Sequence, residues 1–417
     1  LGSYESQLKV GSFEFFDDYY YHYFLAKFSS NGEVDWVRSI GMDDYYYIHP
    51  QKSGLAIGPG GDVYITGQMF HTLYFDELTL INEDSVYEDF FIARFTPEGK
   101  LVHAFNQGAQ KAEMYDIAVD SEENIYVAGS YSGALDLGEG ISPREELTGY
   151  DHRILVKYDK NGIPIWQVTS EEPEPENGSN GFAVEVVDDH VFWAYNSTLG
   201  VEGERSYATR IEKYDSDKNL LAYNGVIGTY LEDYTTGYGM DVYGKEIYLT
   251  GGFRNSLDLL SDNVEPIWSA SNEYTEAYAL RFTDEGAGSF NFNWINSAYG
   301  DANIFGRDIA ASEMGVFWTG QMGSYATFQE STLYGISGDQ NTFIGRIEDA
   351  EGTFDIQITP DQNSTGSYNS GQSISISSNG DPVILGSYDY SVGFGEHTLA
   401  TTYEDFYLLS TISDFSK

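Results

Sequence analysis

The residues best suited to chemistry in this sequence are carboxylates that recur within short apolar segments. They are Asp116, Asp120, Glu185, Asp241 and Asp308. In each segment, acidic or small residues alternate with apolar ones, so a β-strand would carry them on one face. Carboxylates that converge without basic partners either have a raised pKa or bind a cation, and oxygen ligands suit a hard ion such as calcium. Three interpretations stay open: a calcium site, a catalytic acid pair, or carboxylates that are solvated or paired with nearby Lys and Arg.

A second group of candidates consists of tyrosines beside aspartates. The stretches 17–23 (DDYYYHY) and 43–49 (DDYYYIH) each hold three consecutive tyrosines. A strand buries alternate residues, so three in a row cannot all be buried. An exposed tyrosine ring beside a carboxylate suits the recognition of sugars and peptides. The alternative is that the rings stack on one another across strand faces. We predict the binding residues to be Tyr19, Tyr20, Tyr21, Tyr45, Tyr46 and Tyr47.

The sequence lacks the signatures of several common catalytic sites. It contains no cysteine, no Gly-x-Ser-x-Gly motif and no His-x-x-x-His spacing among its seven histidines. We therefore predict a protein that is not an enzyme and requires no cofactor, with calcium as the one metal considered. The alternative is an extracellular enzyme that acts on polysaccharide through paired carboxylates, because spacing in the sequence does not show which carboxylates meet in space.

The elements that must position these residues form a repeat. Within residues 114–168, apolar runs at Ile117–Val119, Ile125–Val127 and Ile154–Val156, and a fourth ending at Trp166, are separated by turns rich in Asp, Asn and Gly. This pattern predicts four antiparallel strands, called first to fourth below. Seven copies recur about 60 residues apart, a period typical of propellers. A glycine ends the second strand at Gly11, Gly67, Gly129, Gly251, Gly320 and Gly386, with Ala194 in its place in one copy. The third strand carries Lys27, Arg94, Lys157, Lys213, Arg281 or Arg346.

The unit, with its Asn-apolar-Tyr-Val-x-Gly and Lys-Tyr-Asp-x-Asn-Gly segments, resembles the SBBP-type β-propeller repeat of secreted and surface proteins of bacteria. The resemblance implies an all-β, seven-bladed propeller of four-stranded antiparallel blades, here with incomplete terminal blades. We expect a single domain, 1–417, whose units are roughly 1–41, 54–108, 114–169, 181–228, 237–299, 306–359 and 373–417.

Within such a fold, each strand face has an expected direction. Apolar residues of the first strands, such as Leu55, Ile57 and Ile117, would pack between blades. Small and acidic residues would face the central axis, where the five carboxylates would gather. The basic residue of each third strand would pair with a nearby acidic residue, its stem packed on aromatic rings. The longer excursions 260–274 and 328–341 would be surface loops.

The formal net charge of −45 limits the partners of the chain. A polyanion would be repelled, which excludes nucleic acid and anionic membrane surfaces. No apolar run reaches the length of a membrane span, so no membrane insertion is expected. The first residue is Leu1 and the terminal units lack strands, so we expect the natural chain to continue at both ends. The leading hypothesis is an extracellular or cell-surface binder of a glycan or a protein, within a larger secreted assembly, and the remaining alternative is a purely structural module.

Overall fold

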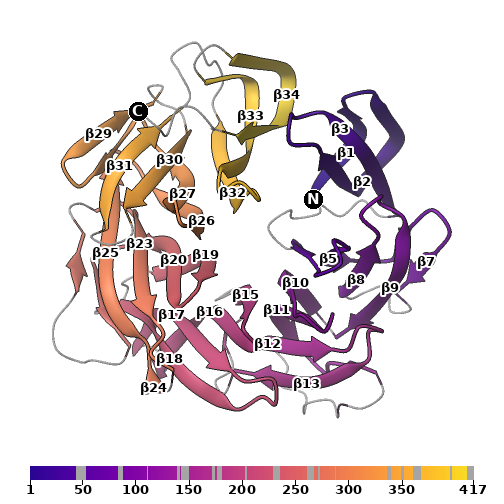
Figure 1. The fold of residues 1–417 in the computed structure, drawn as a ribbon, viewed down its shortest axis with the longest axis horizontal. Helices are drawn as coiled ribbons and strands as arrows, with labels where there is room; N and C mark the ends of the chain where they lie inside the picture. The colour runs from indigo at the N-terminus through magenta and orange to yellow at the C-terminus, as the bar shows by residue number, and fades with distance from the viewer. Residues whose placement is uncertain are drawn as a thin grey trace. The chain divides into compact units, whose positions relative to one another are not determined.

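The computed structural model describes residues 1–43, 53–82, 88–109, 111–138, 141, 150–170, 174–175, 181–201, 204–228, 235–260, 267–270, 273–286, 288–335, 340–348, 352–359, 368–394 and 397–410. Every regular element in these ranges is a β-strand, which confirms the all-β class (Figure 1). None of the described residues forms a helix that could cross a membrane. The chain divides into two compact units, Leu1–Tyr195 with Tyr214–Asn219, and Asn196–Lys213 with Leu220–Lys417.

Three sheets belong to the first unit. Sheet A has the order β1 (Gly2–Val10), β2 (Phe13–Phe28), β3 (Val34–Met42), β6 (Thr72–Tyr74), β7 (Thr79–Ile81). Sheet B has the order β4 (Ser53–Ile57), β5 (Val63–Met69), β8 (Asp89–Phe95), β9 (Leu101–Gly108). Sheet C has the order β10 (Lys111–Val119), β11 (Ile125–Ser132), β12 (Tyr150–Tyr158), β13 (Pro164–Thr169), and β14 (Glu174–Pro175) also pairs with β12. Figure 1 shows β11, β12 and β13 side by side.

Four further sheets follow in the described chain. Sheet D, with strands in both units, has the order β15 (Gly181–Val187), β16 (His190–Val201), β17 (Glu204–Tyr214), β18 (Leu220–Gly228), β21 (Ser256–Leu259), β22 (Trp268–Ser269), with β24 (Gly288–Ser289) on β18. Sheet E has the order β19 (Thr235–Tyr243), β20 (Glu246–Phe253), β23 (Glu276–Thr283), β25 (Asn291–Gly300), β28 (Tyr325–Phe328), β29 (Ser331–Tyr334). Sheet F has the order β26 (Phe305–Ser312), β27 (Gly315–Met322), β30 (Asn341–Glu348), β31 (Thr353–Ile358). Sheet G has the order β32 (Asn369–Ile376), β33 (Pro382–Phe394), β34 (His397–Ser410). The predicted strands of each unit lie in one sheet of the described residues, but sheets A, D and E also contain strands from the following unit, so the sheets and the predicted units have different bounds.

Crowding from the first strand explains the recurring glycine of the second strand. A Cβ added at Gly129 would overlap the backbone oxygen of Glu113, and one at Gly251 would overlap that of Thr236. At this level the first strands of sheets C and E have a register shift, which brings the carbonyl over the glycine. The glycine is therefore required by packing and not by turn geometry.

The glycine was assigned wrongly in two of the copies. In sheet C, Gly129 lies opposite Ile154, three residues before the basic residue Lys157. In sheet A, the residue three positions before Lys27 is Phe24, and Gly2 lies opposite it. Gly2 and not Gly11 is therefore the equivalent glycine. Gly11 instead occupies the β1–β2 turn, with a φ of 60°. In sheet D, Tyr195 and not Ala194 holds the equivalent place, opposite Gly181. Both errors arise because strand sequences do not reveal where pairing begins.

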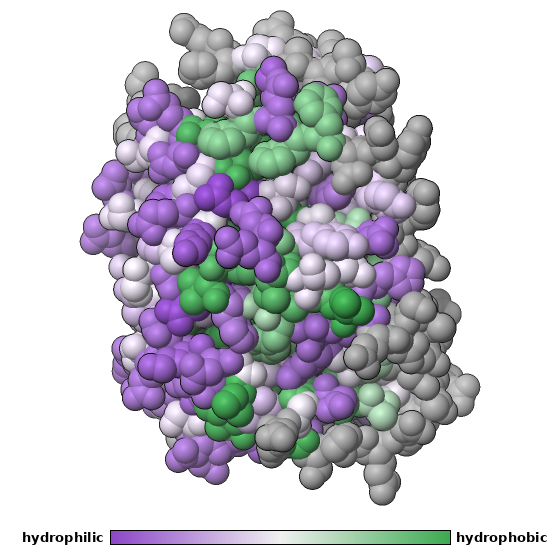
Figure 2. Space-filling view, turned by 90° about the vertical axis from the view of Figure 1, so that its right-hand side faces the viewer, coloured by the Kyte–Doolittle hydropathy of each residue, from purple (hydrophilic) through white to green (hydrophobic). Residues whose placement is uncertain are grey.

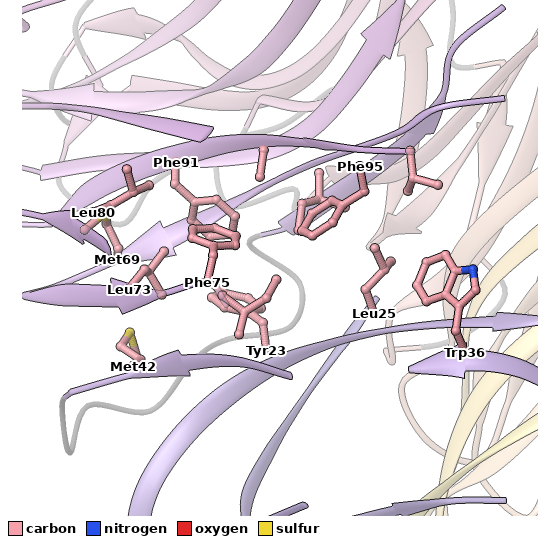
Figure 3. Packing of buried hydrophobic residues seen from close by; sticks show 14 residues of the cluster. Tyr23, Leu25, Trp36, Met42, Met69, Leu73, Phe75, Leu80, Phe91 and Phe95 are labelled. Atoms are coloured by element: carbon pink, nitrogen blue, oxygen red, sulfur yellow. The ribbon is translucent and has the colours of Figure 1, made fainter. Parts of the chain in front are cut away.

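Neighbouring sheets of a unit pack through their apolar faces. Between sheets A and B, Tyr23 and Leu25 of β2 meet Phe91 and Phe95 of β8 (Figure 3). The fourth strand adds a polar contact to the next sheet, since the indole nitrogen of Trp36 donates to the carbonyl of Pro97 at 3.1 Å. The turn that holds Pro97 joins the third and fourth strands of sheet B, so this turn is a contact point for sheet A.

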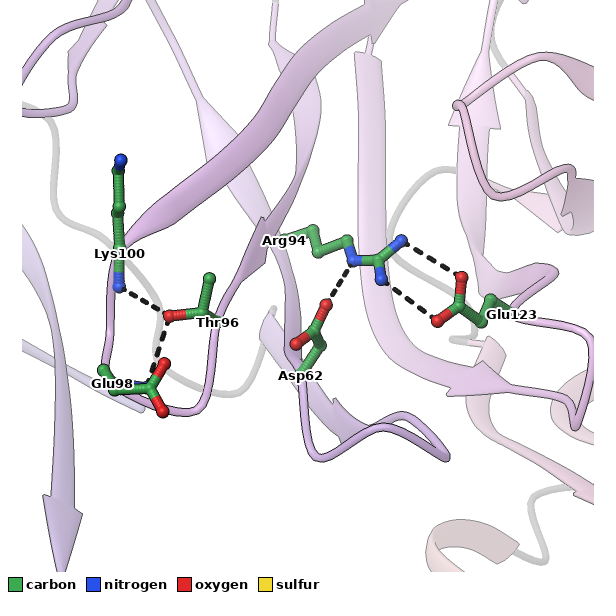
Figure 4. A network of polar contacts seen from close by, with 6 residues as sticks. All are labelled: Asp62, Arg94, Thr96, Glu98, Lys100 and Glu123. Atoms are coloured by element: carbon green, nitrogen blue, oxygen red, sulfur yellow. Dashed lines mark hydrogen bonds and ion pairs between the residues drawn. The ribbon is translucent and has the colours of Figure 1, made fainter.

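Arg94, the basic residue of the third strand of sheet B, pairs with acidic residues and lies against an aromatic ring, as the sequence predicts. Arg94 of β8 forms ion pairs with Asp62 at 2.6 Å and with Glu123 at 3.1 Å, and its guanidinium lies 5.3 Å from the ring centroid of Tyr64 (Figure 4). Asp62 lies in the first turn of sheet B, and Glu123 in the first turn of sheet C. Arg94 therefore fastens two sheets together.

Excursions from the second strands also connect sheets. In the described residues, four excursions return to the fourth strand of the preceding sheet and pair with its last residues. The pairs are Met42 with Leu73, Gly108 with Asp136, Gly228 with Leu257, and Gly300 with Ala326. The excursions 260–274 and 328–341 therefore contain strands β22 and β29, and the prediction that they are only loops is wrong.

Candidate functional site

The first-strand carboxylates bind backbone amides of two strands at once. In the first unit, Asp116 of β10 accepts the N–H of Ile117 at 2.9 Å with one oxygen. Its other oxygen accepts the N–H of Val184, on the first strand of sheet D, at 2.9 Å. The side chain therefore joins two neighbouring first strands that share no main-chain ladder.

The second unit repeats this arrangement at two junctions between first strands. Asp308 of β26 accepts the N–H of Ile309 at 2.9 Å, the N–H of Ile374 at 2.8 Å and the hydroxyl of Ser373 at 2.9 Å. Asp241 of β19 accepts the N–H of Val242 at 2.9 Å and that of Ala311 at 2.6 Å. The two carboxylates thus link β19 to β26 and β26 to β32.

Burial makes the charged forms of these two carboxyl groups costly. It raises the pKa of Asp308 to about 6, against the hydrogen bonds that lower it, and the charge of Asp241 adds to the rise. Burial also raises the pKa of Asp241. The two groups are close enough to interact electrostatically, as expected of carboxylates on one face of neighbouring first strands.

Asp120 and Glu185 lie in different settings. Asp120 accepts the N–H groups of Glu122 and Asn124 at 2.9 Å and 2.8 Å and the hydroxyl of Tyr126 at 3.1 Å, so it holds the β10–β11 turn. Glu185 is half-buried on β15. The described residues contain no group of three or more His, Asp or Glu arranged to hold a metal ion. The calcium site predicted from Asp116, Asp120, Glu185, Asp241 and Asp308 stays a prediction.

A depression on sheet A brings together the other kind of candidate. It has a volume of about 360 Å³ and is lined by Tyr20, His22, Gly41, Met42, Asp43 and Tyr74. Tyr74 is 46% exposed, and its hydroxyl donates to the carboxylate of Asp43 at 3.4 Å. An aromatic face and a carboxylate acceptor therefore lie side by side at the surface.

The elements around this depression fix its shape. Gly41 of β3 lies opposite Tyr74 of β6, so the hairpin contributed by the chain of sheet B supplies one wall. A Cβ added at Gly41 would come within 3.5 Å of both Tyr74 and His22, so the glycine leaves the space between them open. His22 is buried and stacks on Tyr4 at 5.1 Å between ring centroids. The floor is thus rigid, while Tyr74 and Asp43 face solvent.

The predicted tyrosines fall into three groups. Tyr20 lines the depression, and Tyr21 packs partly against the apolar core between sheets A and B. Tyr19 lies in β2, with its side chain outside the described residues, as are Tyr45, Tyr46 and Tyr47 entirely. Sequence reasoning did not identify Tyr74 or Gly41, whose place in the depression depends on the β3–β6 pairing between distant segments. Asp43, which opens the second tyrosine stretch, was the available signal.

No family model matches the chain, and a search of curated proteins finds no similar sequence. The resemblance to the SBBP-type repeat stays a prediction from the residues alone.

Proposed function

We propose that this chain is a non-catalytic binding protein that takes a neutral glycan in the depression on sheet A. The observation that carries the proposal is the exposed ring of Tyr74 beside the carboxylate of Asp43, with Tyr20 on the same depression. A sugar ring stacks its C–H face on an aromatic ring, and its hydroxyls donate to a carboxylate. The rigid floor reduces the ordering cost of binding.

The charge of the chain supports a neutral ligand. With a net charge of −45, the protein repels anionic sugars and acidic peptides. On the face shown in Figure 2, hydrophilic residues predominate and hydrophobic side chains gather in separate patches. Separate patches of this kind do not form the broad apolar interface typical of a permanent protein complex.

We further propose that the seven sheets close into a seven-bladed β-propeller forming one domain, at the cell surface or outside the cell of a bacterium. The repeated junctions within each unit support closure, because the same carboxylate links, third-strand cations and hairpins recur from sheet to sheet. Location and membership of a larger secreted assembly follow from the resemblance to the SBBP-type repeat.

The test is a screen of neutral oligosaccharides against the full chain, followed by calorimetry with the ligands found. Tyr74→Ala should weaken binding about 5- to 30-fold, because it removes a stacking surface worth about 1–2 kcal/mol. Asp43→Asn should weaken it less, since the amide oxygen still accepts one hydrogen bond.

The matched control is Tyr243→Ala, which removes a tyrosine that is 48% exposed on β19. It should leave affinity unchanged. The proposal would be overturned if the Tyr74→Ala and Asp43→Asn variants bound the ligand with the affinity of the unchanged chain. The absence of any neutral ligand would also overturn it. Turnover of a bound glycan would instead support the alternative of a carboxylate-dependent enzyme.

A further inference from the structure

A β-bulge recurs at one level of the first strands. In sheets C to G, the pairing of the first strand with the second shifts directly after the residue opposite the second-strand glycine, or opposite Tyr195 in sheet D. A bulge turns one side chain out of the regular alternation of its strand, and bulges are over-represented next to active sites. None of the bulged residues is acidic, although the chain holds 66 Asp and Glu. They are Tyr115, Phe182, Tyr238, Arg307 and Gln372.

In the second unit, the bulged residues of two neighbouring first strands meet. The guanidinium of Arg307 on β26 lies 4.8 Å from the ring centroid of Tyr238 on β19 and 5.4 Å from that of Phe305. The two rings are perpendicular, with their centroids 6.0 Å apart. Phe305 in turn packs on Gly252 of β20, where an added Cβ would come within 2.8 Å of the ring. Contact with aromatic rings fixes the plane of a guanidinium, so Arg307 is held in one orientation.

The charge of Arg307 has no acidic partner in the described residues. None of the ion pairs found among them includes this side chain. Its Nη2 donates to the side-chain oxygen of Gln321, a neutral group, at 2.9 Å. Asp308, the next residue, binds amides of β26 and β32 instead. Only Nε is a buried nitrogen without a hydrogen bond, and the side chain is half-buried, so the edge formed by Nη1 and Nη2 faces solvent.

Arg94 shows what such an arrangement binds in this protein. Its guanidinium also lies over a tyrosine ring, that of Tyr64, and it forms ion pairs with Asp62 and Glu123. The N–H groups along one edge of a guanidinium match the two oxygens of a carboxylate, and these charge-assisted hydrogen bonds are strong. Arg307 has the same stacked cation, with no carboxylate of the described residues on it. Its chemistry therefore suits a carboxylate from a ligand.

We propose that the Nη1–Nη2 edge of Arg307 binds the carboxylate of a uronic acid residue in an otherwise neutral glycan. The rings of Tyr238 and Phe305 beside the guanidinium supply apolar surface for the C–H groups of a sugar. A peptide carboxyl terminus fits less well, because β26 is paired with β27 and its amides at Ile309 and Ala311 bind Asp308 and Asp241. The strand thus has no open edge for a peptide backbone.

This site is independent of the depression on sheet A, because its residues belong to the second unit and the depression belongs to the first. The net charge of −45 repels an anion at long range. At physiological ionic strength, salt screens that repulsion beyond about 8 Å. At contact distance the guanidinium dominates, so one carboxylate binds while a chain of many uronates is disfavoured.

The test is calorimetry of the full chain with sodium glucuronate and sodium galacturonate at about 0.15 M salt. The controls are the methyl esters of the same sugars, which keep the ring but lose the charge. We expect saturable binding of at least one uronate, and binding of its ester at least about tenfold weaker, through loss of the charge-assisted hydrogen bonds.

Chain variants localise the site. Arg307→Met should weaken uronate binding at least about tenfold, and Arg307→Lys about fivefold, because the ammonium keeps the charge but loses the planar fork. The matched control is Arg254→Met, at an exposed arginine between β20 and β21 of the same unit, and it should leave the affinity unchanged. In the unchanged chain, bound uronate should also protect Arg307 from phenylglyoxal, as measured by peptide mass mapping.

Several results would overturn the proposal. They are the absence of binding by both uronates, equal affinity for the methyl esters, unchanged affinity in the Arg307 variants, and labelling of Arg307 that bound uronate does not slow. Binding of acetate as tight as that of the uronates would show that the sugar ring is not recognised. Tighter binding of a peptide, lost when its carboxyl terminus is amidated, would assign the site to a protein partner instead.

Discussion

The carboxyl group of Asp308 shows how one side chain can be both well bonded and costly to charge. It accepts hydrogen bonds from Ile309, Ser373 and Ile374, and yet burial raises its pKa to about 6. The charge of Asp241 contributes to this rise. The side chain thus joins β26 to β32, and the free-energy cost of keeping it charged in the folded protein depends on pH.

This gives a prediction for stability against pH. A carboxyl whose folded pKa is raised from 3.8 to about 6 contributes stability that is fully present below pH 3.8 and is lost as the pH rises through about 6. The Asp308→Asn side chain does not titrate. As the pH rises from 3.8 to about 6, the melting temperature of the wild type should therefore fall more than that of the variant. Calorimetry across the range checks this. A constant difference between the two proteins would contradict it, and Asp241→Asn should move the transition of Asp308 to lower pH.

Single residues were predictable where the repeat made them visible. The second-strand glycine and the third-strand cation recur in the sequence, and the structure gives each a packing role at Gly129 and Arg94. The bridging role of Asp116 was not predictable, because its acceptor contact at Val184 joins residues 68 positions apart. Tyr74 was missed for the same reason.

Among the elements, the turns between first and second strands act as anchor points for cations from the third strands. Arg94 reaches both Asp62 and Glu123, whose side chains are 17% and 32% exposed, from a position that is itself 19% exposed. Because these charged groups are partly shielded from water, removing one of them would leave its partners both desolvated and unpaired, which destabilises the fold.

Replacing Arg94 should therefore loosen the junction between sheets B and C. Arg94→Met keeps the stem on Tyr64 but leaves two carboxylates without their cation, and we expect a cost of about 1–3 kcal/mol. The melting temperature should fall, and hydrogen exchange should accelerate in the turns at 58–62 and 120–124. The control is Lys9→Met, which breaks an exposed ion pair with Glu14 and should leave the melting temperature unchanged. Equal effects of the two substitutions would contradict the prediction.

The four main strands of most sheets followed from alternation of apolar and polar residues. The hairpins β6–β7, β21–β22 and β28–β29 did not, because they pair with the sheet before them and so depend on contacts that no local pattern reveals. The register of β1 was misread because its turn glycine, Gly11, imitates the glycine that ends the other second strands.

For the whole molecule, the dominant quantity is charge. The 66 acidic residues outnumber the 21 Lys and Arg by more than three to one. The cations can pair with only a small part of this excess, so the remaining carboxylates repel one another across the surface.

Salt should therefore stabilise the fold. Raising NaCl from about 0.01 M to about 1 M shortens the screening length from roughly 30 Å to about 3 Å. We expect the melting temperature to rise over this range at neutral pH and to rise much less near pH 3.5, where most carboxylates are protonated. A melting temperature insensitive to salt at neutral pH would show that surface repulsion is already balanced.

The hairpins described above have a consequence for synthesis. The fourth strand of sheet A ends at Met42, but its partner β6 begins only at Thr72, after the second strand of sheet B has been made. The same delay separates Gly300 from Ala326. During synthesis on the ribosome, the fourth strand of such a sheet therefore lacks its pairing partner until much of the following repeat has emerged. Each of these sheets is completed about one repeat later than its own strands are translated.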